Sequence, residues 1–392
     1  VTRNRESRYR EQLLTPTTTV VVVLMAVVLA LAIVAHANRW GRRGRGLVAF
    51  LGLVDLALLP ASYLARFFPL EDEPASFYWL FLVGVAVAIP LVALVAARGR
   101  GAGRAPLITV LSVVGAVLIA DVVTGSHLSL GAAFGYSPTG NSRLYGISNY
   151  SYGQVAAATC LVAAWLAAVL PGRRGRVAGI GLMVATLVVL GMPTWGSDVG
   201  GVLAFTPAVA TFAVLITGRR IRLRTLVIGA AATGFAILAF GLLDLARPAS
   251  DRGHLGRLFE RMGDEGPSPV IAMVQRKLAA NLEVSTSSLW VLAIPLAVAF
   301  WLYLRRSERR PFDAVVVAFA TLPAGLWAAL VAAVLGSALN DSGAIIGGVM
   351  AMVVATSLAV LLLDVDPAPG PVEDPAASTL AEPVRADGTS PG

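Results

Sequence analysis

Long apolar runs alternate with short polar connections along almost the whole chain. The runs occupy residues 17–36, 46–66, 77–97, 106–124, 150–171, 177–192, 200–217, 225–245, 287–304, 313–336 and 344–363. Most are close to the roughly 17–25 residues that an α-helix needs to cross the hydrocarbon core of a bilayer. The pattern predicts an all-α fold, a polytopic transmembrane helical bundle of about eleven spans (roughly 10–12).

The composition supports this fold class and argues against an ordinary soluble domain. Hydrophobic residues make up 57% of the 392 residues and charged residues only 14%, whereas a soluble domain carries about 25% charged residues. The formal net charge of +8 could indicate nucleic acid binding, but most arginines lie in short clusters between the apolar runs. Such clusters are typical of cytoplasmic loops. We therefore expect membrane lipids as partners and no nucleic acid.

Arginine clusters occur at every second connection. They follow the predicted first, third, fifth, seventh and ninth helices, at residues 39–45, 98–104, 173–176, 219–224 and 305–310. Short loops rich in arginine stay in the cytoplasm during insertion. The alternation therefore predicts that the N-terminus lies outside and the C-terminus in the cytoplasm.

The predicted organisation has three parts. An extracytoplasmic N-terminal segment (1–16) precedes a transmembrane helical domain (17–363), and a tail rich in Pro, Ala and acidic residues (364–392) is expected to be disordered in the cytoplasm. Residues 3–10 contain four arginines, which should resist translocation to the outside. Either the chain is the membrane portion of a larger protein, or a partner delivers it, or one helix is miscounted.

The polar connections with unusual composition all fall on the predicted outer face, at 125–149, 191–199, 246–286 and 337–343. The first carries Asn141, Arg143, Tyr145 and Asn149 among turn-forming residues. One interpretation is a packed outer loop whose tyrosines anchor at the membrane interface, with Asn149 as a helix N-cap. The other is a cavity wall on which Asn141 and Arg143 bind an anion or a sugar.

Asp198 lies in the second of these connections, just before a predicted helix. Pro193 and several glycines predict irregular backbone there, and such backbone at membrane depth is tolerated only where protein or a water-filled cavity surrounds it. The Asp198 carboxylate could cap the positive end of the following helix. The alternative is a general base or a cation ligand.

The third connection, 246–286, is the longest and contains an amphipathic segment that we expect at the outer interface. Arg247, Arg257 and Arg276 could clamp a phosphate, for which guanidinium geometry is suited. His254 could then move protons, because its unperturbed pKa is near neutrality. The alternative is a set of interfacial salt bridges, each of small energetic value.

Three further sites carry polar residues. Asn340 and Asp341 form either a simple turn or part of the same outer site. Asp55 falls near the middle of the second predicted helix, where a charge costs about 2.5–3.5 kcal/mol, so it is either a functional residue or a helix–helix hydrogen bond. Asp121 lies nearer the outer end of its helix. The histidines and the single cysteine show no metal-ligand spacing, and no nucleotide-binding motif occurs, so we expect no metal and no cofactor.

Several short motifs together resemble a known family. GYSP, NSRLYGISN, GMPTWGSDVGG, RPASDRGHLGR, RKLAAN and LNDSG are similar to the membrane portion of a bacterial multi-pass membrane protein family, whose members often carry an extracytoplasmic alkaline-phosphatase-like domain ahead of their helices. The positions that match are Asn149, Asp198, Arg247, His254, Arg257, Arg276, Lys277, Asn281, Asn340 and Asp341. Leu144 and Ser148 depart from the family pattern, which has an aromatic residue and a glycine there.

The resemblance implies a multi-pass protein of the bacterial plasma membrane and, as a possible partner, an extracytoplasmic phosphatase-like domain or protein. It implies no activity for the membrane part, and the phosphatase-like domain is absent from this sequence. Three functions stay open. The protein handles an anionic or lipid-linked envelope substrate in an outward-facing polar cavity, with Asp198 or His254 in any acid–base step; or it is a transporter or flippase; or it is a non-catalytic anchor for an extracytoplasmic hydrolase.

Overall fold

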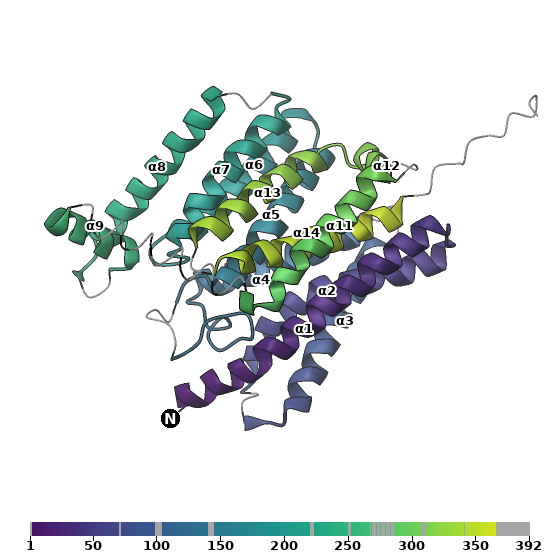
Figure 1. The fold of residues 1–392 in the computed structure, drawn as a ribbon, viewed down its shortest axis with the longest axis horizontal. Helices are drawn as coiled ribbons and strands as arrows, with labels where there is room; N and C mark the ends of the chain where they lie inside the picture. Colours follow the sequence, from purple (N-terminus) through teal and green to yellow (C-terminus); the bar gives the residue numbers. More distant parts are fainter. Residues whose placement is uncertain are drawn as a thin grey trace, which may run out of the picture.

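The structure is a computed structural model, and it describes most of the chain. The described residues are 2–69, 72–98, 104–139, 145–219, 223–249, 252–266, 286–307, 311–340 and 342–365, with isolated positions between 268 and 283. Within these residues the regular structure is helical, apart from one isolated bridge between Leu130 and Tyr136. The predicted all-α fold class is confirmed (Figure 1).

The helices follow one another in a long up-and-down order. They are α1 (Thr2–Ala37), α2 (Arg42–Leu64), η1 (Ala65–Phe67), α3 (Ala75–Ala97), α4 (Ala105–Val123), α5 (Asn149–Val169), α6 (Gly172–Gly191), α7 (Val199–Ile216), α8 (Leu223–Leu245), α9 (His254–Glu265), η4 (Leu289–Leu292), α11 (Ala293–Arg306), α12 (Pro311–Ala318), α13 (Leu322–Leu339) and α14 (Ala344–Asp364). Ten helical segments are long and apolar enough to cross a membrane, and the described apolar part of α8, residues 229–245, is shorter.

One predicted helix boundary is wrong, and the first helix extends further towards the N-terminus than its apolar run. The run 313–336 is not one helix, because the chain breaks at residues 319–321 between α12 and α13. Pro323 stands in the first turn of α13, where its missing N–H costs nothing and its fixed φ favours a helix start. The first helix begins at Thr2, so most of the expected N-terminal segment 1–16 is a continuation of α1. Its arginines, glutamates and leucines are good helix formers.

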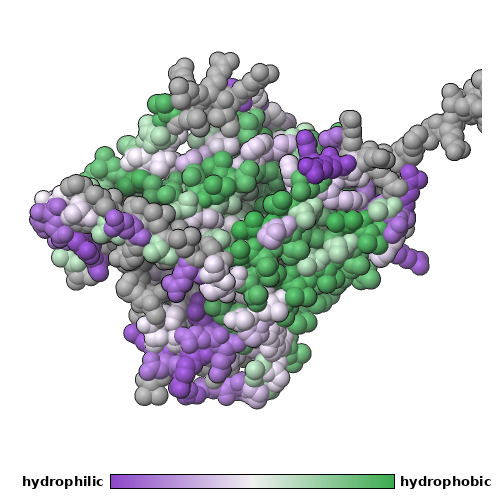
Figure 2. All heavy atoms as spheres, viewed as in Figure 1, coloured by the Kyte–Doolittle hydropathy of each residue, from purple (hydrophilic) through white to green (hydrophobic). Residues whose placement is uncertain are grey.

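The bundle has two polar ends, separated by an apolar band (Figure 2). The arginine end carries the short connections after α1, α3, α5, α7 and α11, with Arg42, Arg98, Arg173, Arg219 and Arg305. The loop end carries the first turns of α1 and the connections before α5, α7, α9 and α14, with Asn149, Asp198, Arg247 and Asn340. The apolar band between two polar ends is the surface expected of an integral membrane protein.

The interior of the bundle is built around α14. Of its most apolar stretch, 83% is buried, compared with 22% for α3 and for the span formed by η4 and α11. α14 packs against α1, α2, α5, α11 and α13. α3 is a peripheral helix, and its Val92 and Val95 side chains are exposed on the apolar band. Exposed valines on such a band are the residues that would face lipid.

Candidate functional site

The connection between α4 and α5 is organised by Asp121. This carboxylate, 3% exposed, accepts hydrogen bonds from the backbone N–H of Leu128 (2.6 Å) and from the backbone N–H and hydroxyl of Ser129 (2.9 and 2.6 Å). A buried carboxylate with three donors is well satisfied. Asp121 was predicted to lie within a span, nearer its outer end, and these contacts give it a structural role in folding the loop.

The same connection is joined to the α6–α7 turn at Gly146. The Ile147 N–H donates to the carbonyl of Gly196 (3.1 Å). Gly146 has φ +102°, and a Cβ atom there would lie 2.6 Å from the Gly196 oxygen. Only glycine combines that backbone conformation with so close an approach. The two connections are therefore held together where the polar loop enters α5.

The start of α5 differs from the prediction by one residue. The N-cap is Ser148, whose hydroxyl accepts from the Ser151 N–H (3.1 Å), and not Asn149. Serine and asparagine are equivalent as caps, so the sequence could not separate them. The Asn149 side chain is released for another contact, and its amide donates to the Ser342 hydroxyl (2.5 Å). Asn149 thus touches the connection before α14.

Asp198 and Asn340 lie together at the first turn of α7. Asp198 is the N-cap, and its Oδ1 accepts from the Gly201 N–H (2.9 Å). Asn340 is 4% exposed, and a Cβ atom on Gly200 would clash with its side-chain oxygen. The Asn340 side-chain nitrogen has no hydrogen-bond partner among the described residues. Asp198 and Asn340 therefore meet at the start of α7, and Asn149 contacts Ser342 in the connection that follows Asn340.

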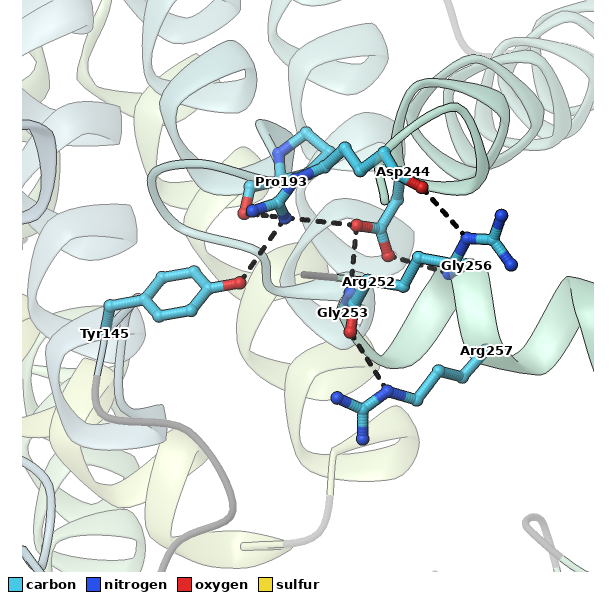
Figure 3. A network of polar contacts seen from close by, with 8 residues as sticks. Tyr145, Pro193, Asp244, Arg252, Gly253, Gly256 and Arg257 are labelled. Carbon is cyan, nitrogen blue, oxygen red and sulfur yellow. Dashed lines mark hydrogen bonds and ion pairs between the residues drawn. The ribbon is translucent and has the colours of Figure 1, made fainter. Parts of the chain in front are cut away.

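Asp244, at the end of α8, fixes the turn into α9 (Figure 3). It is 2% exposed and accepts from the backbone N–H groups of Gly253 (3.0 Å) and Gly256 (2.7 Å). Gly253, the N-cap of α9, has no side chain, so Asp244 supplies from a distance the carboxylate that a helix start favours. The sequence analysis did not select Asp244 as a site residue.

Arg247 connects three parts of the loop end, which contribute Tyr145, Pro193 and Asp244 (Figure 3). Its guanidinium donates to the Asp244 carboxylate (3.3 Å), the Pro193 carbonyl (3.3 Å) and the Tyr145 hydroxyl (3.5 Å). The hydrogen bond to Tyr145 is the main reason that the pKa of Arg247 is raised above its usual value, with Asp244 adding to the same effect. Arg247 is thus a fixed positive charge at the junction of these connections.

The other two described arginines of this turn are held differently. Arg252 donates to the Arg247 carbonyl (3.1 Å) and pairs with Glu260 (3.1 Å). Arg257 is exposed, and the one polar partner of its guanidinium among the described residues is the Arg252 carbonyl, at 3.0 Å from Nε. Its two terminal nitrogens point away from the cluster in Figure 3. Arg257 is therefore the guanidinium here that is open to a ligand.

A small cavity lies between Asp198 and Asp244. Its lining includes Pro193, Ser197 and Phe240, and its volume is about 10 Å³. A cavity of that size holds about one water molecule. The expected outward-facing cavity of substrate size is thus not formed by these residues, and any ligand of this cluster would have to bind at its surface.

Asp55 is sealed inside the bundle. Its side chain is 0% exposed, and its Oδ2 accepts from the hydroxyl of Thr356 on α14 (3.2 Å). Asp55 lines neither the loop-end cavity nor a larger cavity at the arginine end. The contact with Thr356 is the helix–helix hydrogen bond considered as the alternative for Asp55. A route through the bundle at this residue loses its support.

Several predicted site residues lie outside the described part of the chain. They are Asn141, Arg143, Arg276, Lys277, Asn281 and Asp341. For His254 the structure describes the backbone at the start of α9. Among the described residues, no group of three His, Cys, Asp or Glu side chains could hold a metal ion.

Comparison of the chain with protein-family models, curated proteins and solved structures gives no match. The resemblance to the bacterial family with a phosphatase-like domain therefore stays a prediction.

Proposed function

We propose that this integral membrane protein binds the phosphate of an anionic, lipid-linked envelope substrate at its loop end, on the extracytoplasmic side of a bacterial plasma membrane. The observation that carries the proposal is the exposed guanidinium of Arg257, which is joined through Arg252 to the turn that contains Arg247. Arg247 is fixed by contacts to Tyr145 and Pro193, which come from two other connections. A guanidinium matches the geometry of a phosphate, and a rigid neighbour reduces the cost of ordering the site.

Arg257 differs from the other two arginines of the α8–α9 turn in its partners. Arg247 and Arg252 each pair with a carboxylate, Asp244 and Glu260 respectively, whereas the Arg257 guanidinium has a backbone carbonyl as its partner among the described residues. An exposed ion pair is worth little in water. A phosphate at the membrane surface would gain from a charge-assisted hydrogen bond, while its lipid chain stays in the bilayer.

The arginines bind the substrate, and Asp198 and His254 are the candidates for acid–base chemistry. Asp198 already accepts a backbone hydrogen bond as the cap of α7. His254 follows Gly253, whose N–H is held by Asp244. If the bound substrate is converted, Asp198 and His254 are the groups that would move protons. Arg276, Lys277 and Asn281 would complete the phosphate site from the segment that follows α9.

A second candidate is an anchor for an extracytoplasmic hydrolase. It is favoured by the bracing of the first turns of α1, where Arg10 donates to the Gly135 carbonyl (3.0 Å) and Ser7 bonds to Ser137 (2.8 Å). A braced helix would hold a domain carried before it in a fixed position above the membrane. A transporter is the least supported of the three functions, because Asp55 is sealed.

A binding experiment in nanodiscs tests the phosphate site. The purified protein is offered a polyprenyl phosphate and the corresponding uncharged polyprenol, and bound lipid is counted by native mass spectrometry. We expect the phosphate to be retained and the alcohol to be lost. Arg257→Gln should lower retention about tenfold, because a hydrogen bond to a charged group contributes about 1.5–3 kcal/mol.

The matched control is Arg261→Gln. Arg261 is also exposed on α9, one helical turn further along, and has no polar contact with the described residues. Its replacement should leave retention unchanged. Equal retention of the phosphate and the alcohol, or equal losses in the two variants, would refute the site.

A further inference from the structure

A larger cavity lies at the opposite end of the bundle from the proposed site. It has a volume of about 310 Å³ and is formed where α2, α3, α4 and α14 meet. Its lining residues are Arg42, Arg45, Gly46, Ala49, Phe50, Leu53, Leu94, Pro106, Val360, Leu363 and Asp364. Ligand-binding pockets have volumes of about 300–1,000 Å³, so this cavity is large enough for a headgroup.

The polar lining of this cavity is positively charged. Arg42 and Arg45 lie on the first turn of α2, and the one carboxylate in the lining, Asp364, is also 4.0 Å from Arg104. Arg42 is exposed and has no hydrogen bond or ion pair with the described residues. Arg45 is 8% exposed and donates to the Val365 carbonyl (2.8 Å). The lining of the cavity thus carries two guanidinium groups and one carboxylate.

The rest of the lining is apolar and borders the membrane-facing surface. Phe50, Leu53 and Val360 form the wall on α2 and α14. Leu94, on the peripheral helix α3, lines the cavity and is 38% exposed. A ligand in this cavity therefore meets arginines at one side and hydrocarbon at the other. That combination fits the headgroup and first chain carbons of a phospholipid.

We propose that this cavity binds the phosphate of an anionic phospholipid from the leaflet at the arginine end. Basic pockets between membrane helices are suited to such headgroups. In this proposal the exposed Arg42 contacts the phosphate at the mouth of the cavity. The buried Arg45 contacts it from inside the cavity and keeps its hydrogen bond to the Val365 carbonyl at the end of α14. The bound lipid joins α2, α3 and α14 at their ends. This site is independent of the proposed function at the loop end.

The test uses lipid retention on the full chain. Protein in nanodiscs of phosphatidylcholine with phosphatidylglycerol is released in a mass spectrometer, and bound lipids are counted. We expect selective retention of phosphatidylglycerol. Arg42→Gln should reduce it about five- to tenfold, since a basic residue near the membrane surface contributes about 1 kcal/mol or more. Arg43→Gln is the matched control, because Arg43 is exposed on the same turn but does not line the cavity.

Two further experiments test whether the cavity itself is needed and whether its ligand is a lipid or a soluble phosphate. Ala49→Phe fills the cavity without changing its charge and should also abolish selective retention, while a retained melting temperature shows that the variant folds.

In the second experiment, inorganic phosphate is added in place of the anionic lipid. We expect phosphatidylglycerol to raise the melting temperature; if inorganic phosphate raises it equally, the ligand is a soluble phosphate and the lipid assignment is wrong. Equal retention of the two lipids, or equal losses in Arg42→Gln and Arg43→Gln, would overturn the site.

Discussion

The two ends of the bundle use arginine in different ways. At the loop end, Arg10, Arg66 and Arg252 each donate to a backbone carbonyl of a connection. At the arginine end, Arg42 has no polar contact with the described residues and, with Arg45, lines a cavity of about 310 Å³. These three arginines support the backbone of the connections, whereas Arg42 is exposed.

The difference follows from the connections. The long connection between α4 and α5 is mostly irregular, so many of its carbonyl groups lack helical partners. Buried carbonyls must find donors elsewhere, and a guanidinium offers five. The short connections at the arginine end leave few such carbonyls. An arginine is therefore available for a ligand where the surrounding backbone is already satisfied.

The largest expected effect comes from removing the carboxylate that organises the α8–α9 turn. Asp244→Ala leaves the buried N–H groups of Gly253 and Gly256 without their acceptor and Arg247 without its ion pair. Each unsatisfied group costs about 1–3 kcal/mol. We expect a loss of about 3 kcal/mol in the free energy of unfolding in detergent, with faster amide exchange along α9.

The control for this prediction is Glu260→Ala. It removes the exposed partner of Arg252, and an exposed ion pair contributes at most about 1 kcal/mol. If the two variants lose equal stability, the loop end does not depend on buried acceptors, and the contrast between the two ends is weakened.

A smaller effect is expected at the junction of two loop-end connections. Gly146→Ala puts a side chain at φ +102° and 2.6 Å from the Gly196 oxygen. A strained backbone of this kind costs about 1–3 kcal/mol. The melting temperature should fall, whereas Gly263→Ala, on an exposed face of α9 with open space around it, should leave it unchanged or raise it. An unchanged melting temperature for Gly146→Ala would show that the two connections are not held together there.

The smallest effect is expected from the hydrogen bond between Tyr145 and Arg247. Tyr145→Phe removes one long hydrogen bond of Arg247 (3.5 Å) and should cost no more than about 0.5 kcal/mol. Phosphate retention should nevertheless fall slightly, because Arg247 loses one of its supports. In a double-mutant cycle with Arg247→Gln, additive losses of retention would show that Tyr145 does not position this arginine.

The spans could be predicted because an apolar run of about 20 residues is explained by one structure, a helix that crosses the bilayer. The cap at Asp198 could also be predicted, since it depends on residues close in the chain. The break between α12 and α13 was missed although Pro323 favours a helix start there. Prolines also lie inside α2, α3 and α7, so a proline in an apolar run does not by itself mark a break. Ser148 and Asn149 are equally good caps, so the choice between them is made by their contacts with other segments.

The role of Asp244 could not be read from the sequence. Its partners Gly253 and Gly256 are nine and twelve residues away, and a glycine N–H gives no pattern that a sequence analysis can detect. The contact of Asp55 with Thr356 joins residues 301 positions apart. Similarly, the cavity at the arginine end forms only when four helices meet. Each of these features depends on contacts between residues that are far apart in the sequence, and such contacts exist only in the packed bundle.

We infer that the two ends of the bundle face different compartments, with the loop end outside. Gly263 and Gly41 are exposed glycines, one at each end, with open space around them. The single native cysteine, Cys160, is buried, so a cysteine introduced at either position gives a clean signal. In intact cells, a membrane-impermeant maleimide should label Gly263→Cys and should label Gly41→Cys only after lysis. Labelling of Gly41→Cys in intact cells, with Gly263→Cys protected, would contradict the account.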